Sequence, residues 1–231
     1  MITKLKKFLL LEVKNEISKY NKDVIEASIG LLLSDGHLRN SNVNRKKNKT
    51  FSKGNYYMSF TFKVFNVQGE SMMGFNNWLK FNVLWKICTK SSLNLYPKNN
   101  PTQCTFNTKS LILFTKIYPF FYNLKNKKKI INQSFLMEYF NGRVLAFMLM
   151  GDGYWDNREK TVYICTECYS LEDINKLLFV FRHKLNLIVS TRKRKGNLRI
   201  RFSSKGNNLK LLRQLTKPHF HLIMLYKLGL I

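Results

Sequence analysis

Two short apolar runs that each end in Asp-Gly dominate the hydrophobic pattern of this chain. The first is residues 28–36 (SIGLLLSDG) and the second is residues 145–153 (LAFMLMGDG), about half the chain apart. Both runs are apolar on almost every side, so they predict helices buried nearly all round. Asp23 and Glu26 predict a capping box before the first helix, and Asn141 predicts the cap of the second.

After each apolar run the pattern changes to strict alternation, which predicts strands. In residues 57–64 the apolar side chains alternate with the polar side chains of Ser59, Thr61 and Lys63. Residues 187–195 and 197–203 flank Gly196 and predict a hairpin in which Arg199 and Arg201 face away from the apolar side. We expect a half-buried strand in the first half and a basic outward face on the hairpin in the second.

The second half of the chain repeats the order of the first. Residues 170–185, capped by Ser170, predict a helix that corresponds to a first-half helix over residues 69–80. Late in each half a helical segment leads to a lysine at a matched place, Lys129 and then Lys227. This order predicts an α+β fold of two pseudo-twofold-related αββαββα half-domains. We expect an N-terminal arm or helix over residues 1–20, a first half-domain over 21–130 and a second over 131–231.

Net charge narrows the choice of partners. The chain has 40 Lys and Arg against 13 Asp and Glu, a net charge of +27, which indicates a polyanionic partner. The basic residues are spread along the whole chain, and no apolar run reaches the roughly 18 residues that a transmembrane helix needs. We therefore expect a nucleic-acid-binding protein with no membrane partner.

Two features argue against secretion and against a zinc site. Residues 1–11 resemble a presequence, but Glu12 and Glu16 follow and no cleavage site is evident, so we interpret them as a leading helix or arm. The four cysteines are too few and too irregular for a disulfide framework, and the pair Cys165 and Cys168 has no second pair to complete a zinc site.

On these residues the chain resembles the LAGLIDADG homing endonucleases. Their nine-residue motif has an acidic residue at the eighth position and Gly at the ninth, and both apolar runs fit it. Two copies in one very basic chain are similar to the monomeric, two-motif members. The resemblance implies two antiparallel sheets that form a DNA-binding saddle, with the motif helices between the halves.

The resemblance also implies the catalytic residues. Asp35 and Asp152 would hold Mg²⁺ or Mn²⁺, with the backbone carbonyls of Ser34 and Gly151 beside them. Lys129 and Lys227 would act near the scissile phosphates, and the alternative for each lysine is a simple phosphate contact. For the aspartates the alternative is ordinary turn chemistry, because Asp-Gly is a common turn pair. We interpret Glu138, Asp156 and Glu167 as ordinary charges or ion-pair partners, with Asp156 as an outside candidate for the site.

Sequence reading is expected from the strands, because a two-stranded ribbon fits the major groove. The predicted DNA-binding residues are Arg39, Ser59, Thr61, Lys63, Lys109, Arg192, Arg194, Arg199, Arg201 and Lys205. Residues 45–53 add a basic stretch that we expect to neutralise phosphates. His37 is a further candidate for DNA contact or packing.

The function that follows is a site-specific nuclease making metal-dependent double-strand breaks, with short 3′ overhangs, in a long, non-palindromic DNA target, which would promote intron mobility. The main alternative is an intron RNA maturase with the same fold, and a DNA-binding protein without cleavage is a third. Both aspartates favour the nuclease. Richness in Lys, Asn, Ile, Phe and Tyr suggests an A+T-rich genome, so we expect an organelle-encoded protein of fungal mitochondria acting as a monomer.

Overall fold

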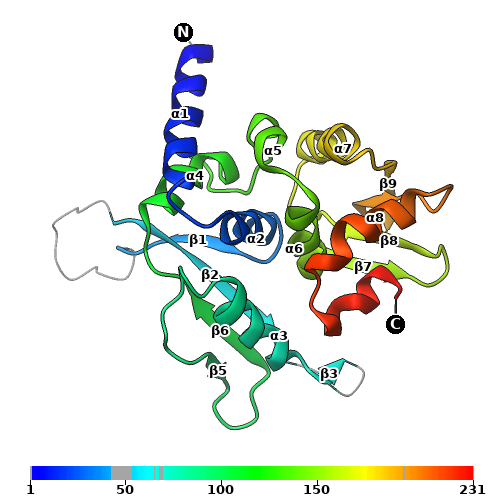
Figure 1. Cartoon of the computed structure of the whole chain (residues 1–231), viewed down its shortest axis with the longest axis horizontal. Coiled ribbons are helices and arrows are strands. Elements are labelled where there is room, and N and C mark those ends of the chain that lie inside the picture. The colour runs from blue at the N-terminus through cyan, green and yellow to red at the C-terminus, as the bar shows by residue number, and fades with distance from the viewer. Residues whose placement is uncertain (1, 43–53, 65, 68–69, 195, 231) are drawn as a thin grey trace. The chain divides into compact units, whose positions relative to one another are not determined.

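The computed structural model describes residues 2–42, 54–64, 66–67, 70–194 and 196–230. The chain forms two compact units (Figure 1). The first unit comprises Met1–Ser28 and Asp35–Pro119, and the second comprises Ile29–Ser34 and Phe120–Ile231. The end of the first apolar run thus belongs to the second unit, and the units meet in sequence at Pro119, earlier than the boundary expected at residue 130.

The first unit is built on a four-stranded antiparallel sheet with the order β1-β2-β6-β5. Its long N-terminal helix is joined to α4 by an ion pair between Glu12 and Lys116, with 2.6 Å between the charged atoms. In chain order the elements are α1 (Ile2–Ile17), α2 (Lys22–Leu32), β1 (His37–Asn40), β2 (Tyr56–Lys63), β3 (Asn66–Val67), β4 (Glu70–Ser71), α3 (Met72–Trp78), a π-helix (Leu79–Val83), β5 (Asn94–Tyr96), β6 (Gln103–Asn107) and α4 (Ile112–Phe121).

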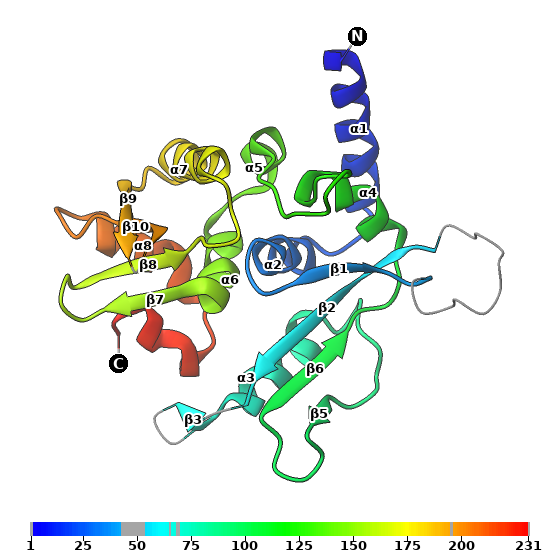
Figure 2. The same ribbon diagram turned by 180° about the vertical axis from the view of Figure 1, so that it is seen from behind.

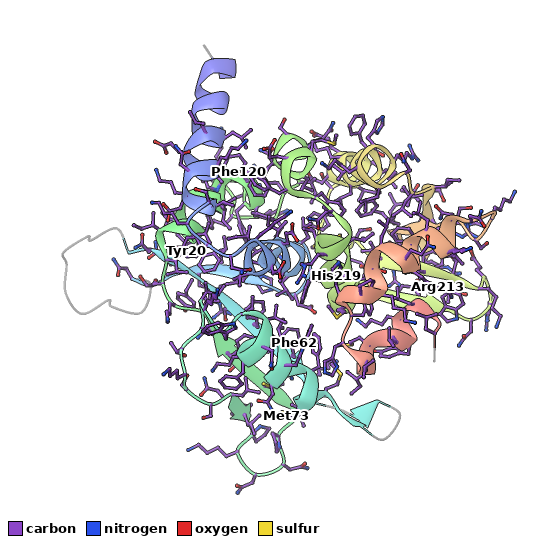
Figure 3. All side chains as sticks on the ribbon, viewed as in Figure 1. Tyr20, Phe62, Met73, Phe120, Arg213 and His219 are labelled. Carbon is purple, nitrogen blue, oxygen red and sulfur yellow. The ribbon has the colours of Figure 1, made fainter. Side chains whose placement is uncertain are left out.

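One face of this sheet is apolar and covered by α3. Figure 1 shows α3 in front of β2 and β6, and Figure 2 shows the same strands in front of α3. Phe62 (labelled in Figure 3) meets Phe75 of α3 edge to face, with 5.9 Å between ring centroids. The predicted alternation in β2 is confirmed from Phe60 onward, because Phe60 and Phe62 are buried whereas Thr61 and Lys63 are exposed, but Ser59 is buried as well.

The first-half helix differs from the expectation over residues 69–80. It begins at Met72 and continues past Trp78 as a π-helix to Val83. The wider turn keeps Leu79 buried and leaves Phe81 43% exposed.

The second unit repeats the topology of the first. Its four-stranded antiparallel sheet has the order β7-β8-β10-β9, which matches the first sheet strand for strand. The elements are α5 (Gln133–Tyr139), α6 (Gly142–Asp152), β7 (Gly153–Asp156), β8 (Thr161–Cys165), α7 (Leu171–Leu185), β9 (Val189–Arg194), β10 (Asn197–Phe202), α8 (Asn208–Thr216) and two 3₁₀ segments, η2 (Lys217–His219) and η3 (Leu222–Leu228). Each unit therefore carries the predicted order αββαββα, once from α2 to α4 and once from α6 to α8. None of the helices in the described part of the chain is both long and apolar enough to cross a bilayer.

The helix caps are partly as expected. Asn141 accepts a hydrogen bond from Val144 N at 3.1 Å and caps α6, and Ser170 accepts one from Asp173 N at 3.1 Å and caps α7. The capping box predicted at Asp23 is wrong. Helix α2 begins one residue earlier, and Asn21 accepts from Asp23 N at 2.8 Å, because Asn is as good an N-cap as Asp.

The end of α2 packs tightly on α6 at Gly30. A Cβ at Gly30 would meet the carbonyl oxygen of Val144 and would lie 2.7 Å from Cβ of Phe147 and 3.1 Å from Met148 N. Phe147 is only 1% exposed. It is the residue that the second motif has in place of Gly30, so a large side chain on one motif helix fills the space that the glycine leaves on the other.

Candidate functional site

Both predicted lysines bind the ends of the motif helices. Lys129 donates a hydrogen bond from Nζ to the backbone oxygen of Ser34. Lys227 donates from Nζ to the backbone oxygens of Met150 and Gly151, at 2.7 Å each. Ser34 and Gly151 immediately precede the two motif aspartates, so each ammonium group lies beside an Asp-Gly turn. Lysines are favourable at such places because helix C-terminal carbonyls carry partial negative charge.

Both motif aspartates are half-buried. Asp152 is the last residue of the buried helix α6, whereas Asp35 follows the end of α2 by a short turn. At each motif the carboxylate and the carbonyl of the preceding residue, Ser34 or Gly151, offer oxygen donors only, which is the chemistry that Mg²⁺ and Mn²⁺ prefer.

These oxygen donors fit a divalent ion whose remaining ligands come from a substrate and water. Among the described residues no group of three or more His, Cys, Asp or Glu side chains is close enough to enclose a metal. Mg²⁺ is commonly held by one or two carboxylates together with substrate phosphates and water. The carbonyls of Ser34 and Gly151 each have two lone pairs, so a lysine bond leaves one acceptor position.

Two residues near this site could not be identified from the sequence. Tyr169 is 8% exposed and donates from its hydroxyl to the backbone oxygen of Leu33 at 2.8 Å. Burial raises the pKa of Tyr169 well above its ordinary value, so it remains a neutral donor. Desolvation also raises the pKa of Cys168, an effect that the charge of Lys129 opposes and that of Asp152 reinforces. The turn after β8 brings both residues to the site, and nothing in their spacing indicates this.

Arg213 holds the segment that carries Lys227. This side chain of α8, labelled in Figure 3, donates from Nε and Nη2 to the backbone oxygen of Leu228 at 3.0 and 2.8 Å. Its guanidinium also lies 5.3 Å from the centroid of the Trp155 ring. Gly229 follows with φ of +64° and lies against the same ring, so a side chain there would be strained and would clash. These contacts fix the position of η3 and therefore of Lys227.

The first sheet presents a polar face opposite α3. The register places His37 beside Ser59, Thr61 beside Thr105 and Lys63 beside Gln103. Arg39, Thr61, Lys63 and Lys109 are exposed, whereas Ser59 is only 8% exposed. Sequence reasoning missed the contribution of β6, where Gln103, Thr105 and Asn107 lie on this same face. The basic stretch at residues 45–53 lies outside the described residues, as do its expected phosphate contacts.

The second sheet brings the four predicted arginines to one face. Arg199 pairs with Arg192 across the β9–β10 ladder, Arg201 pairs with Ser190, and Arg194 lies at the hairpin end. Arg192 and, beyond the strand, Lys205 are exposed. The face is not simply basic as expected, because Arg194, Arg199 and Arg201 form ion pairs with Asp156, Glu159 and Glu167. Asp156 and Glu167 are therefore ion-pair partners, as the sequence indicated.

Comparison with known proteins identifies the family of this chain. Residues 25–209 match the model of the LAGLIDADG DNA endonuclease family. This chain belongs to that family. The two apolar runs that end at Asp35 and Asp152 are its two LAGLIDADG motifs.

Two fungal relatives show how the chain compares within the family. Over 223 residues, 94% of this chain, it is 23% identical to a cytochrome b mRNA maturase, bI2, of Saccharomyces cerevisiae, and it spans 50% of that relative's length. Over 130 residues, 54% of this chain and 89% of the relative, it is 32% identical to a probable intron-encoded DNA endonuclease 3 of Mycosarcoma maydis.

Solved structures confirm the fold. The homing endonuclease I-WcaI bound to its DNA recognition sequence superposes with a TM-score of 0.68 at 22% identity, over 94% of this chain and 91% of that chain. A variant of I-DmoI in complex with nicked target DNA in the presence of manganese has a TM-score of 0.51 at 14% identity, over 87% of this chain and 100% of that chain. The LAGLIDADG chain thus has the duplicated α+β fold that its sequence predicts.

Proposed function

We propose that this chain is a site-specific homing endonuclease that makes divalent-metal-dependent double-strand breaks, with short 3′ overhangs, in a long, non-palindromic DNA target and so promotes intron mobility. The observation that carries the proposal is the matched pair of helix ends. At each, a lysine contacts the backbone oxygen next to a motif aspartate. Two equivalent centres suit the cleavage of two strands.

In this proposal Asp35 and Asp152 hold Mg²⁺ or Mn²⁺, with the carbonyls of Ser34 and Gly151 as further oxygen ligands. A divalent cation held by these residues would supply Lewis-acid stabilisation of charge on the phosphate and would lower the pKa of a bound water. Lys129 and Lys227 place a positive charge beside each site, where it stabilises the transition state of phosphodiester cleavage. The buried Tyr169 and the Arg213 contacts keep these groups in position.

The polar faces of the two sheets bind duplex DNA in this proposal. Asn and Gln side chains such as Asn107 and Gln103 can read adenine, and Arg192 and Arg39 can read guanine in the major groove. The predicted roles of Ser59, Thr61, Lys63, Arg194, Arg199 and Arg201 belong to this interface, and Lys109 and Lys205 supply phosphate contacts.

The deciding experiment offers the protein a library of long duplex DNA with Mg²⁺ and sequences the ends of any cut molecules. We expect defined double-strand breaks from the wild type, and loss of breaks with retained binding in Asp35→Asn and Asp152→Asn. Asp23→Asn is the matched control, because Asp23 is an exposed aspartate in the first turn of α2, the helix that precedes Asp35. Cutting that survives both motif substitutions would overturn the assignment of the site.

A second function, assistance to intron RNA splicing, is supported by the yeast maturase, which matches 94% of this chain. One surface of the first unit suits single-stranded RNA. Phe81 and Trp85 are 43% and 58% exposed, on the layer that covers the apolar face of the sheet, and Lys86 lies 5.4 Å from the Trp85 ring centroid. Exposed aromatic rings beside cations bind bases by stacking. The sequence has no acidic residue between Glu70 and Glu138, so nothing in this stretch opposes RNA.

RNA binding and DNA cleavage can be separated by substitution. We expect Trp85→Ala to weaken the binding of folded intron RNA while leaving duplex cleavage unchanged. Leu222→Ala, a truncation of an apolar residue that is 75% exposed on the second unit, is the control. Equal RNA binding by both variants would exclude this surface.

We further propose a fungal mitochondrial origin and a monomeric state. The two relatives come from fungi, and both motifs lie in one chain. Finding the coding sequence within an intron of organelle DNA tests the first proposal, and light scattering of the purified protein tests the second.

A further inference from the structure

The arginines on the second sheet are already occupied by carboxylates. Arg194 donates from Nη2 to Glu159 at 2.6 Å and to Asp156 at 3.0 Å, and Arg201 donates from Nε to Glu159 at 2.7 Å. At the other end, Arg199 donates from Nε and Nη2 to Glu167 at 2.9 and 2.7 Å. We call these six side chains, Asp156, Glu159, Glu167, Arg194, Arg199 and Arg201, the carboxylate–arginine network.

Glu159 is the central residue of the network. Besides the two arginines, its carboxylate accepts the Tyr163 hydroxyl at 2.7 Å. The Tyr163 hydrogen bond and then the Arg201 hydrogen bond hold the pKa of Glu159 below its ordinary value, so it stays charged. Tyr163 is fully buried although it lies on the polar face, because the network covers it.

Tyrosine rings pack against the guanidinium groups of two of these arginines. The Arg194 guanidinium lies 5.3 Å from the Tyr163 ring centroid and that of Arg199 lies 5.2 Å from the Tyr154 ring centroid. Tyr154 and Tyr163 stack on each other with 5.4 Å between centroids. A guanidinium held by a carboxylate and a ring has lost its rotational freedom before it meets any ligand.

The two sheets arrange their charges differently, although Arg192 and Lys193 of β9 lie outside the network. Three positive and three negative side chains make the network neutral. Strands β1, β2, β5 and β6 of the first sheet contain no Asp or Glu at all, whereas they carry Arg39 and Lys63. Sequence-independent attraction to DNA comes from uncompensated positive charge, and base reading comes from oriented donors.

We propose that Glu159, supported by Asp156 and Glu167, is a specificity-determining residue that orients Arg194 and Arg201 toward base edges and cancels their attraction to DNA of any sequence. Arg201 uses Nε for Glu159, so its terminal nitrogens can still donate to guanine. The network then contributes discrimination, and basic residues outside it, such as Arg39, Lys63 and Arg192, contribute general affinity. This inference rests on the proposed DNA-binding function.

The test compares Glu159→Gln with the wild type on two duplexes, the target selected by wild-type cleavage and a random-sequence duplex, across several salt concentrations with Ca²⁺ in place of Mg²⁺. We expect Glu159→Gln to bind random DNA more tightly, with a slope of log affinity against log salt steeper by about 0.9 for the one uncompensated charge. We expect its preference for the target to fall by about tenfold.

Glu172→Gln is the matched control. It removes the same charge from α7, where Glu172 is 79% exposed and pairs with Lys176. The helix α7 packs on the apolar side of the sheet through Phe181 and Phe202, whose ring centroids are 5.8 Å apart. We expect this variant to keep the wild-type preference for the target.

Other outcomes would contradict either this proposal or the proposed function. An equal change in both variants would reduce the effect to net charge and overturn the proposal, as would an unchanged preference in a folded Glu159→Gln protein. If Glu159→Gln fails to fold, Glu167→Gln frees Arg199 at the other end of the network, and we expect the same two changes. A wild type that binds no duplex would instead refute the proposed function, which separates the two failures.

Discussion

At the scale of single residues, the two lysines explain how an apolar helix can end in a carboxylate. A charge at the end of a buried helix is costly unless it is compensated. Lys227 compensates the end of α6 through the carbonyls of Met150 and Gly151, and Lys129 does the same at Ser34. In the proposed function the same ammonium groups act on the scissile phosphates.

Replacing Lys227 by Met tests whether it has more than a structural role. We expect cleavage to fall by about a hundredfold or more, because a charge aimed at the developing transition state is lost, while DNA affinity changes little. Single-turnover cleavage and filter binding measure the two effects. Lys184→Met, which removes an exposed lysine from the last turn of α7, is the control. A loss of cleavage matched by an equal loss of binding would reduce Lys227 to a phosphate contact.

Gly30 is the other residue whose neighbours decide its role. We expect Gly30→Ala to destabilise the protein by about 1–3 kcal/mol, because the added methyl group meets the backbone of α6 and cannot be accommodated by a side-chain rotation. Denaturant titration measures the change. Gly74→Ala in α3 is the control, since a Cβ there meets no atom within 4 Å, and we expect it to be neutral or stabilising. Equal stability of the two variants would contradict the close approach.

At the scale of elements, the same topology is built from unequal parts. Helix α6 continues to Asp152 and leads directly into β7, whereas α2 ends at Leu32 and reaches Asp35 through a turn. The sheets share a strand order, but the second carries the carboxylate–arginine network, whereas the strands of the first contain no Asp or Glu. The proposed DNA target is non-palindromic, so two unequal halves of the protein would each bind a different half of the target.

The cap of α6 gives a prediction at this scale. Asn141→Ala removes the acceptor for Val144 N, and we expect a loss of about 1 kcal/mol in the free energy of unfolding. Thermal or denaturant unfolding measures it. Asn207→Ala is the control, because Asn207 precedes α8 without a side-chain cap bond. A loss of similar size in Asn207→Ala would indicate that the loss in Asn141→Ala does not come from the capping hydrogen bond.

At the scale of the whole molecule, net charge sets the general affinity for nucleic acid. With +27 overall, binding to random duplex should be driven by counterion release. If the protein makes six to ten phosphate contacts, raising the salt from 50 to 200 mM should lower its affinity by about 10³- to 10⁵-fold. A salt titration by fluorescence anisotropy measures this, with a neutral polymer of similar length as control. A nearly flat response would argue against a polyanionic partner.

The sequence alone determined the repeated αββαββα order, the two motif helices, the alternating strands and the matched lysines, because all of these follow from local periodicity and spacing. It did not predict Tyr169, Arg213 or the carboxylate–arginine network of the second sheet. Those depend on which carboxylates and rings lie beside each side chain, and only the tertiary structure brings Glu159 beside Arg194 and Arg201 or sets Phe147 against Gly30. Periodicity decides which face a residue lies on, whereas contacts between residues distant in the chain decide its charge balance and its neighbours.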